Sequence, residues 1–143
     1  MPLPVDRPIP EAVQQRAVNS FVLDPGTWCH ISTYSVASHG YAQIGWFDRD
    51  LGRNVGTTAH RAAYTARYGV IPDGMTVDHI CREKRCVNPA HLRVLSNVAN
   101  AADNGNARKT HCLRGHPFDE ANTYVSRLGH RYCRACKRYR RAR

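Results

Sequence analysis

The strongest constraint on how this chain can fold is the spacing of cysteine and histidine in residues 77–92. Cys81, Cys86 and His91 recur there at five-residue intervals. Thiolate and imidazole groups are typical zinc ligands, and structural zinc is almost always held by four of them in a tetrahedron. A zinc ion bound here would fix the shape of the loop and compensate for a thin hydrophobic core.

The fourth ligand of this first cluster has to come from another part of the chain. Cys29 is the best candidate, because every other cysteine already belongs to a group with metal-type spacing. His30 and His60 remain alternatives at this stage. With Cys29 as the ligand, zinc would attach the N-terminal β segments to the loop.

A second cluster follows near the C-terminus, where two ligand pairs are separated by sixteen residues. Paired ligands that flank a hairpin-length insert are a strong zinc signature, and His111 and His130 are less well spaced alternatives. The expected ligands are Cys112, His116, Cys133 and Cys136. Both clusters are expected to be structural, because four protein ligands leave no open position for water.

Six cysteines could instead form three disulfide bonds. Disulfides require an oxidising compartment, and the N-terminal residues 1–6 have neither the charged region nor the apolar region of a secretion signal. Zinc is therefore the favoured interpretation of both groups.

The charge balance predicts a polyanionic partner. With 21 Lys and Arg against 11 Asp and Glu, the chain has a formal net charge of +10, which favours nucleic acid. No 18-residue apolar run is present, so a membrane-spanning segment is not expected. Basic residues near the C-terminus are expected to grip DNA phosphates, although a merely solubilising tail is the alternative. They are Arg131, Arg134, Lys137, Arg138, Arg140 and Arg141.

The sequence divides into four expected parts of an α+β protein. Residues 1–25 read as an extended lead-in and a short helix, and residues 26–104 as the main domain. Residues 105–110 are a linker, and residues 111–143 a small basic unit like a zinc finger. Within the main domain, residues 28–34 and 41–47 read as β segments and residues 48–54 as a turn or loop. A helix is expected from Thr57 or Thr58 to about Tyr68, ended by Gly69. Residues 75–104 then read as strand, metal-tied loop, strand and helix.

A second constellation is interleaved with the first zinc ligands. Asp78 and His79 close the expected strand, and Asn100 lies in the first turns of the expected helix. A neutral imidazole can act as a general base near neutral pH, while carboxylate and amide oxygens suit Mg²⁺ or Mn²⁺. The alternative is a buried Asp-His pair beside an ordinary polar helix residue.

These motifs resemble the HNH-type (ββα-metal) endonucleases, in the branch common among bacteriophage genes. The similar runs are residues 60–64, 69–74, 77–79 and 86–92. The order of His79, Cys81, Cys86, His91 and Asn100 also resembles the His-Cys box homing endonucleases. The likeness covers about residues 26–104 and departs in two respects. His91, which suits zinc binding, replaces the central Asn of the family name, and the position before the base, here Asp78, is Asp in only some relatives.

The resemblance implies a ββα-metal fold and metal-dependent hydrolysis of DNA, leaving 5′-phosphate and 3′-hydroxyl ends. His79 would be the general base, Asn100 and Asp78 would bind catalytic Mg²⁺ or Mn²⁺, and Arg61 would contact the scissile phosphate. The substrate would be double-stranded DNA, cut by a monomer or homodimer in the cytoplasm of a bacterial host. The alternatives are a non-catalytic zinc-stabilised DNA-binding module and a nuclease accessory to phage DNA packaging.

Overall fold

The computed structural model describes residues 7–103, 109–127 and 130–141. The chain forms two compact units, Met1–Ser96 and Asn97–Arg143, and each is described separately below. No helix in the described ranges is long and apolar enough to cross a membrane. The expected linker at 105–110 lies mostly outside the described residues, and the expected domain boundaries stay predictions.

The core of the first unit lies between two helices and a hairpin. Helix α1 (Glu11–Asn19) packs on α2 (Ala59–Tyr68) and also contacts strand β3 (Gln43–Asp48). Small side chains let the helices approach closely, since three alanines of α2 are fully buried. The buried apolar cluster is Ile9, Val13, Ala17, Ala42, Ile44, Ala59, Ala62, Ala63, Val77, Val87 and Leu92.

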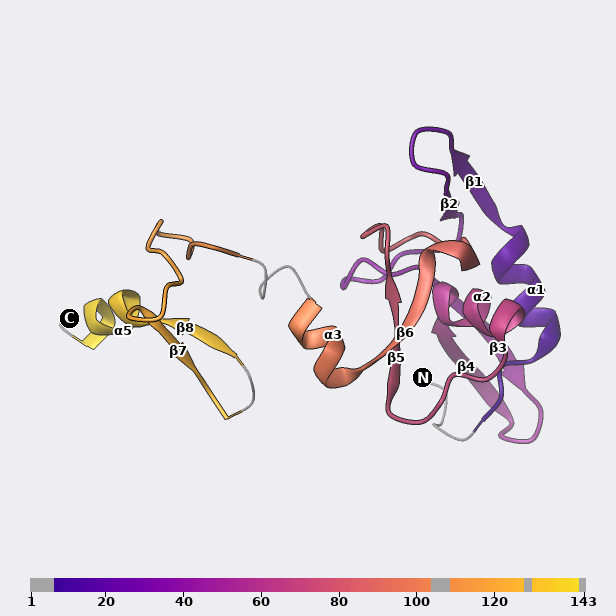
Figure 1. Ribbon diagram of the computed structural model, residues 1–143. Coiled ribbons are helices and arrows are strands. Elements are labelled where there is room, and N and C mark those ends of the chain that lie inside the picture. Colours follow the sequence, from indigo (N-terminus) through magenta and orange to yellow (C-terminus); the bar gives the residue numbers. More distant parts are fainter. Residues whose placement is uncertain (1–6, 104–108, 128–129, 142–143) are drawn as a thin grey trace. The chain divides into compact units, whose positions relative to one another are not determined.

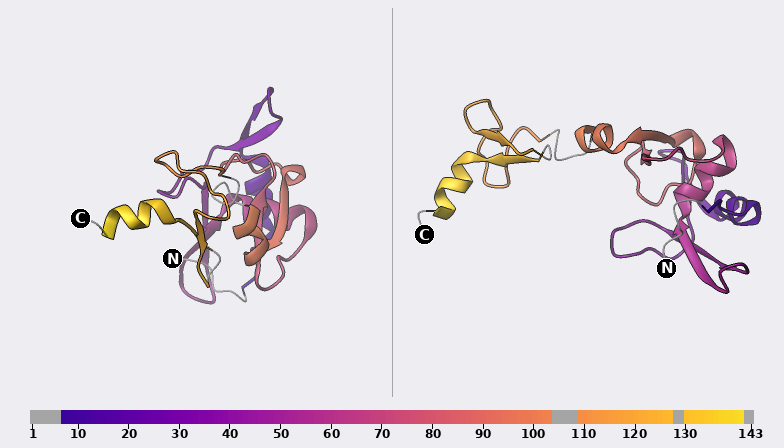
Figure 2. Two further views of the ribbon diagram at one scale, coloured as in Figure 1. Left: turned by 60° about the vertical axis from the view of Figure 1, so that its left-hand side comes forward. Right: turned by 90° about the horizontal axis from the view of Figure 1, so that it is seen from below.

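Two antiparallel hairpins precede α2. Strand β1 (Phe21–Asp24) pairs with β2 (Cys29–Ser32), and this hairpin projects from the rest of the unit (Figures 1 and 2). Strand β3 pairs with β4 (Arg53–Thr58), which leads directly into α2. The sequence predicted β structure at 28–34 and 41–47, but it missed β1 and read much of the start of β4 as a turn.

Helix α2 begins and ends where the sequence predicts. Thr58 is its N-cap residue, although the Thr58 side chain makes no capping hydrogen bond. Gly69 ends the helix with φ +88, a conformation that glycine adopts without the steric cost of a side chain. This helix carries both His60 and Arg61.

The metal-ligand loop connects the last two strands of the unit. Strand β5 (Met75–His79) pairs with β6 (Leu92–Ser96) in antiparallel register, so that Asp78 lies opposite Arg93. A 3₁₀ turn, η1 (Pro89–His91), closes the loop just before β6. The loop also pairs with β2, because Val87 N–H donates to the carbonyl of His30 and Ser32 N–H donates to that of Arg85.

The second unit begins with helix α3 (Asn97–Asp103). Strand β7 (Thr123–Val125) pairs with β8 (Arg131–Cys133), and helix α5 (Arg134–Arg141) continues directly from β8 (Figures 1 and 2). The mixed α+β class is confirmed, and the order strand, loop, strand, helix over 75–103 is the one predicted from the sequence.

Candidate functional site

His79 is buried at the end of β5, with 5% of its surface exposed. Its Nε2 lies 3.0 Å from the backbone carbonyl oxygen of Cys86. Because a carbonyl oxygen only accepts hydrogen bonds, Nε2 must carry the proton, and Nδ1 of the neutral ring keeps its lone pair. The Cys86 carbonyl therefore selects the tautomer in which Nδ1 can accept a proton.

The electrostatic surroundings of His79 favour its neutral form. Burial is the largest cause and lowers the pKa of the imidazole, while the bond to the Cys86 carbonyl and the charges of Asp78 and Glu83 act in the opposite direction. The net direction is downward. A base must be unprotonated to accept a proton, so this environment suits general-base chemistry near neutral pH.

Aromatic rings surround His79 on the inside of the unit. The ring centroid of His60 lies 4.6 Å from that of His79, and the Tyr41 ring lies 5.9 Å away. The ring centroid of Tyr41 also lies 5.0 Å from that of His60 and 5.3 Å from that of His39. The role of His60 and Tyr41 in this cluster was missed by the sequence reasoning, which considered His60 only as an alternative zinc ligand.

Asp78 is held by an arginine across the hairpin. Its Oδ2 accepts a hydrogen bond of 2.9 Å from Nε of Arg93. Nη2 of Arg93 lies 2.9 Å from the same oxygen and forms an ion pair with it. The pair follows from the register, since the two residues face each other in the β5–β6 ladder. A catalytic cation at Asp78 would therefore share this carboxylate with the guanidinium.

Asn100 lies on α3, which belongs to the second unit, whereas His79 belongs to the first. The convergence of the two side chains, expected from the sequence, therefore stays a prediction. So does the assignment of Asn100 and Asp78 as ligands of a catalytic cation.

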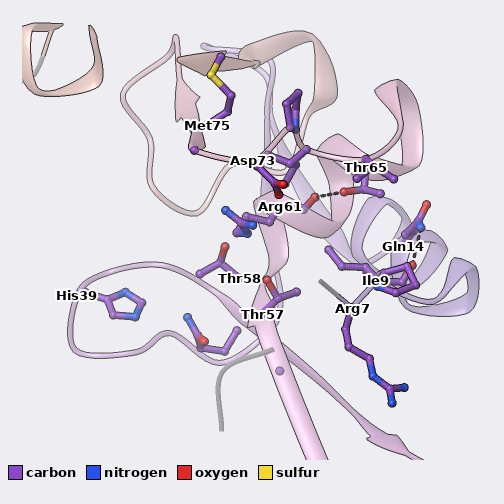
Figure 3. A pocket seen from close by; sticks show the side chains of 17 residues that line it. Arg7, Ile9, Gln14, His39, Thr57, Thr58, Arg61, Thr65, Asp73 and Met75 are labelled. Carbon is purple, nitrogen blue, oxygen red and sulfur yellow. Dashed lines mark hydrogen bonds between the residues drawn. The ribbon is translucent and has the colours of Figure 1, made fainter. Parts of the chain in front are cut away.

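Arg61 lines a pocket of about 680 Å³ in the first unit (Figure 3). Its side chain is half-buried, and burial lowers the pKa of its guanidinium. Within the described residues, no acidic side chain forms an ion pair with it. Thr57 and Thr58 line the same pocket, and the buried Oγ1 of Thr58 has no hydrogen-bond partner in the described part of the chain.

The first predicted zinc cluster is brought together by strand β2 and the loop between β5 and β6 of the first unit. The ligand atoms of Cys29, Cys81, Cys86 and His91 all lie within 4.8 Å of one another. Nδ1 of His91 is 3.6 Å from Sγ of Cys29 and 3.6 Å from Sγ of Cys86. Zinc bond lengths of about 2.3 Å to sulfur and 2.0–2.1 Å to nitrogen, at tetrahedral angles, place sulfur and nitrogen about 3.6 Å apart.

These distances also decide between the alternatives for the fourth position. Cys29 belongs to the cluster, and His60 packs against His79 instead. His30 stacks on Phe21 with ring centroids 3.9 Å apart. Burial, as the largest cause, raises the pKa of the Cys86 thiol to about 12, so a metal ion that binds there must displace a proton.

The second cluster has the same type of geometry in the second unit. The ligand atoms of Cys112, His116, Cys133 and Cys136 lie within 4.8 Å of one another. Nδ1 of His116 is 3.4 Å from Sγ of Cys112, 3.6 Å from that of Cys133 and 3.4 Å from that of Cys136. The two sulfurs of Cys112 and Cys136 are 3.8 Å apart, close to the value of about 3.8 Å expected for two thiolates on one zinc ion. Both groups could thus hold zinc.

The basic residues near the C-terminus lie on β8 and α5. Arg134, Lys137 and Arg138 are exposed, and Nζ of Lys137 lies 5.0 Å from the ring centroid of Tyr124. Arg131 lies over the ring of Phe118 at 4.7 Å. The side chains of Arg140 and Arg141, also expected to bind DNA, lie outside the described part of the structure.

The β5–β6 hairpin thus carries three members of a Cys/His cluster in its loop and a buried histidine at the end of β5, and helix α3 follows it in the sequence. Residues 57–102 match the family model described as HNH endonuclease. This match confirms, for residues 57–102, the resemblance to HNH-type endonucleases that was inferred from the sequence.

Two known proteins are similar to the chain. Protein 7.7 of Escherichia phage T7 is 37% identical over 71 residues, which cover 50% of this chain and 50% of that protein. The chain thus spans about half the length of the curated relative it matches. A solved structure describing DNA binding and cleavage by the HNH homing endonuclease I-HmuI has a TM-score of 0.46 and 19% identity, covering 84% of this chain and 77% of that one.

Proposed function

We propose that the protein is a metal-dependent DNA endonuclease in which His79 is the general base. The observation that carries this proposal is the 3.0 Å contact between Nε2 of His79 and the Cys86 carbonyl, within a segment that matches the HNH endonuclease family. The contact leaves the lone pair of Nδ1 available to accept a proton from water.

In the proposed reaction, Nδ1 of His79 takes a proton from a water molecule, and the water oxygen attacks the scissile phosphorus. The bond from phosphorus to the 3′ oxygen breaks, and that oxygen leaves with a proton from solvent. The products carry a 5′-phosphate and a 3′-hydroxyl. His79 afterwards returns its proton to solvent.

The oxygen donors of Asp78 and Asn100 suit Mg²⁺ or Mn²⁺. When bound there, such a cation supplies positive charge to the scissile phosphate and the leaving oxygen. The carboxylate of Asp78 is already oriented by Arg93 at 2.9 Å, which supports its role as a fixed ligand.

Arg61 is proposed to contact the scissile phosphate. Arg61 follows His60 on α2, and its charge is among the causes that lower the pKa of His60, whose ring packs at 4.6 Å on His79. This supports a cation in the neighbourhood of the proposed base. A guanidinium without an acidic partner among the described residues is available for a phosphate.

Zinc in the two Cys/His clusters is proposed to be structural, and the basic residues of β8 and α5 to hold double-stranded DNA as substrate. The half-length match to a phage protein supports a protein that acts in the cytoplasm of a bacterial host, as a monomer or homodimer. The three exposed cations Arg134, Lys137 and Arg138 support a phosphate-binding surface on α5.

The decisive experiment compares wild type with His79→Ala on supercoiled plasmid, with and without Mg²⁺. His130→Ala serves as the matched control, because His130 is exposed and belongs to neither cluster. Zinc content and thermal unfolding of all three preparations are measured first. Mg²⁺-dependent nicking by wild type and the control, lost in His79→Ala, supports the proposal.

If zinc-loaded wild type binds DNA but leaves plasmid and mixed-sequence DNA intact, the protein is instead a DNA-binding module. Co-purification with phage packaging subunits, and cleavage only in their presence, would identify a nuclease that serves a packaging assembly.

A further inference from the structure

His60 is a buried polar residue that the proposed reaction does not use. It has 7% of its surface exposed and lies in the first turn of α2, among the alanines that pack against the core. It is not part of either Cys/His cluster. Buried polar side chains in a small core carry a cost unless their hydrogen bonds or contacts offset it, so its position calls for an explanation.

The hydrogen bonding of His60 fixes its own tautomer. Its imidazole bonds to the backbone of Val77, and this bond raises the pKa of His60, so the ring must be the donor and the carbonyl the acceptor. Nδ1 of His60 is buried and has no partner among the described residues. Nε2 therefore carries the proton that is donated to Val77.

This bond ties α2 to the strand that carries the proposed base. Val77 is two residues before His79 on β5 and is itself buried in the core. The ring of His60 also packs on the ring of His79, with centroids 4.6 Å apart and planes inclined by 52°. One side chain thus contacts both the backbone of β5 and the imidazole at its end.

His60 stays uncharged under the conditions in which the reaction is expected to run. Burial, followed by the nearby His79, lowers its pKa to about 3. A neutral ring adds no positive charge beside His79. Because its pKa is lowered, His60 is also a weak competitor for the proton that the proposed base His79 would take from water.

From these contacts we propose that His60 is a positioning residue for His79. It holds the His79 imidazole at the angle at which Nε2 meets the Cys86 carbonyl and Nδ1 remains available. The proposal rests on the proposed function of His79, and it requires the donor of His60 as well as its ring.

Two substitutions separate the effect of the hydrogen-bond donor of His60 from the effect of its ring. His60→Phe keeps a planar ring against His79 but loses the hydrogen bond to Val77. His60→Gln loses the ring but keeps an amide N–H that reaches the position of Nε2. His60→Met, of similar size and without a donor, replaces His60→Phe if the phenyl ring prevents folding.

The first measurement is the tautomer of His79, read from its imidazole ¹⁵N shifts in each zinc-loaded protein, with His79→Gln used for assignment. Wild type and His60→Gln are expected to show the single Nε2–H tautomer, and His60→Phe a mixture of tautomers. This reading requires no cleavage, so it separates a failure of this inference from a failure of the proposed nuclease activity.

The second measurement is steady-state cleavage of an oligonucleotide duplex. His60→Phe is expected to lower kcat by about a hundredfold, the loss typical of a misplaced catalytic group, with KM changed less than about threefold because DNA contacts stay intact. His60→Gln is expected to recover most of that loss. A single His79 tautomer with unchanged kcat in folded His60→Phe or His60→Met would overturn the proposal.

Discussion

The Nε2 atom of His79 and the carbonyl oxygen of Cys86 are 3.0 Å apart, and Cys86 Sγ belongs to the first Cys/His cluster. The residue that orients the proposed base is therefore also a proposed zinc ligand. A change of the loop around the metal would be transmitted to the base through a single backbone hydrogen bond. Zinc in this loop would thus control catalysis without contacting DNA.

Removal of a ligand from the first cluster is expected to abolish cleavage as well as zinc binding at that site. Cys81→Ser should lower the zinc content by one ion per chain and destabilise the first unit, because structural zinc supplies folding free energy on the order of 10 kcal/mol. The His79 tautomer should become mixed wherever the variant remains folded. Metal analysis, thermal unfolding and imidazole ¹⁵N shifts check these outcomes. A variant that loses the zinc ion but keeps both the tautomer and cleavage would show that the loop holds its shape unaided.

The same change in the second cluster should have a different consequence. Cys133→Ser is expected to lose one zinc ion and to weaken DNA binding through β8 and α5. It should leave the His79 tautomer unchanged, because the Cys86 carbonyl belongs to the first unit. Gel-shift titrations and the same spectra test this contrast. A mixed His79 tautomer in Cys133→Ser would contradict it.

The sequence predicted the grouping of the Cys and His side chains better than the strands around them. The spacing of Cys81, Cys86 and His91 already predicts a shared metal ion. Short metal–ligand bonds allow only a few spacings of the ligands along a loop, and this spacing is one of them. Strand β1 (Phe21–Asp24) could not be predicted in the same way, because its residues do not alternate between buried and exposed. It forms a strand through its pairing with β2, which the sequence does not display. The same holds for the early part of β4, which reads as a turn until β3 pairs with it.

The environment of the proposed base depends on contacts that no sequence pattern displays. The carbonyl that selects the tautomer of His79 belongs to the backbone, so it leaves no residue-type signature. The packing of His60 on His79 joins residues nineteen positions apart through the approach of α2 to β5. The pairing of Asp78 with Arg93 follows from strand register, which the sequence predicted only as two strands joined by a loop.

Arg61 and Arg67 offer a matched test of the phosphate contact, because both lie on α2 but only Arg61 lines the pocket (Figure 3). Arg61→Gln is expected to reduce the slope of log affinity against log salt by about one, as for the loss of one phosphate contact. It should also lower kcat, if that phosphate is the scissile one. Arg67→Gln should leave kcat near wild type. Equal effects of the two substitutions on kcat and on the salt slope would mean that α2 contributes only diffuse positive charge.

The proposed role of Asp78 as a metal ligand can be tested through the Mg²⁺ dependence of cleavage. Asp78→Asn keeps the size of the side chain but removes the charge that attracts a divalent cation. The Mg²⁺ concentration for half-maximal cleavage should rise about tenfold or more, in line with the loss of a charged ligand. A titration of initial rates against Mg²⁺, with the zinc content held constant, measures this. If Asp78→Asn lowers the rate at all Mg²⁺ concentrations without shifting the midpoint, Asp78 acts only through its pairing with Arg93.

His60 should make the folded state sensitive to acid. Its pKa is about 3 in the folded chain, against 6.5 as the reference value for the unfolded chain. Between these values the unfolded state binds the proton and the folded state does not, so stability falls as the pH drops below the unfolded value. The loss from this one group approaches about 1.4 kcal/mol per pH unit well below the unfolded pKa.

Because zinc ligands also lose metal in acid, the informative quantity is the difference in unfolding free energy between wild type and His60→Gln. The free energy of unfolding of wild type should fall more steeply with decreasing pH than that of the variant, in denaturant titrations at fixed zinc. Parallel curves would mean that the imidazole of His60 takes up its proton without unfolding, and that the buried pair with His79 is open to water.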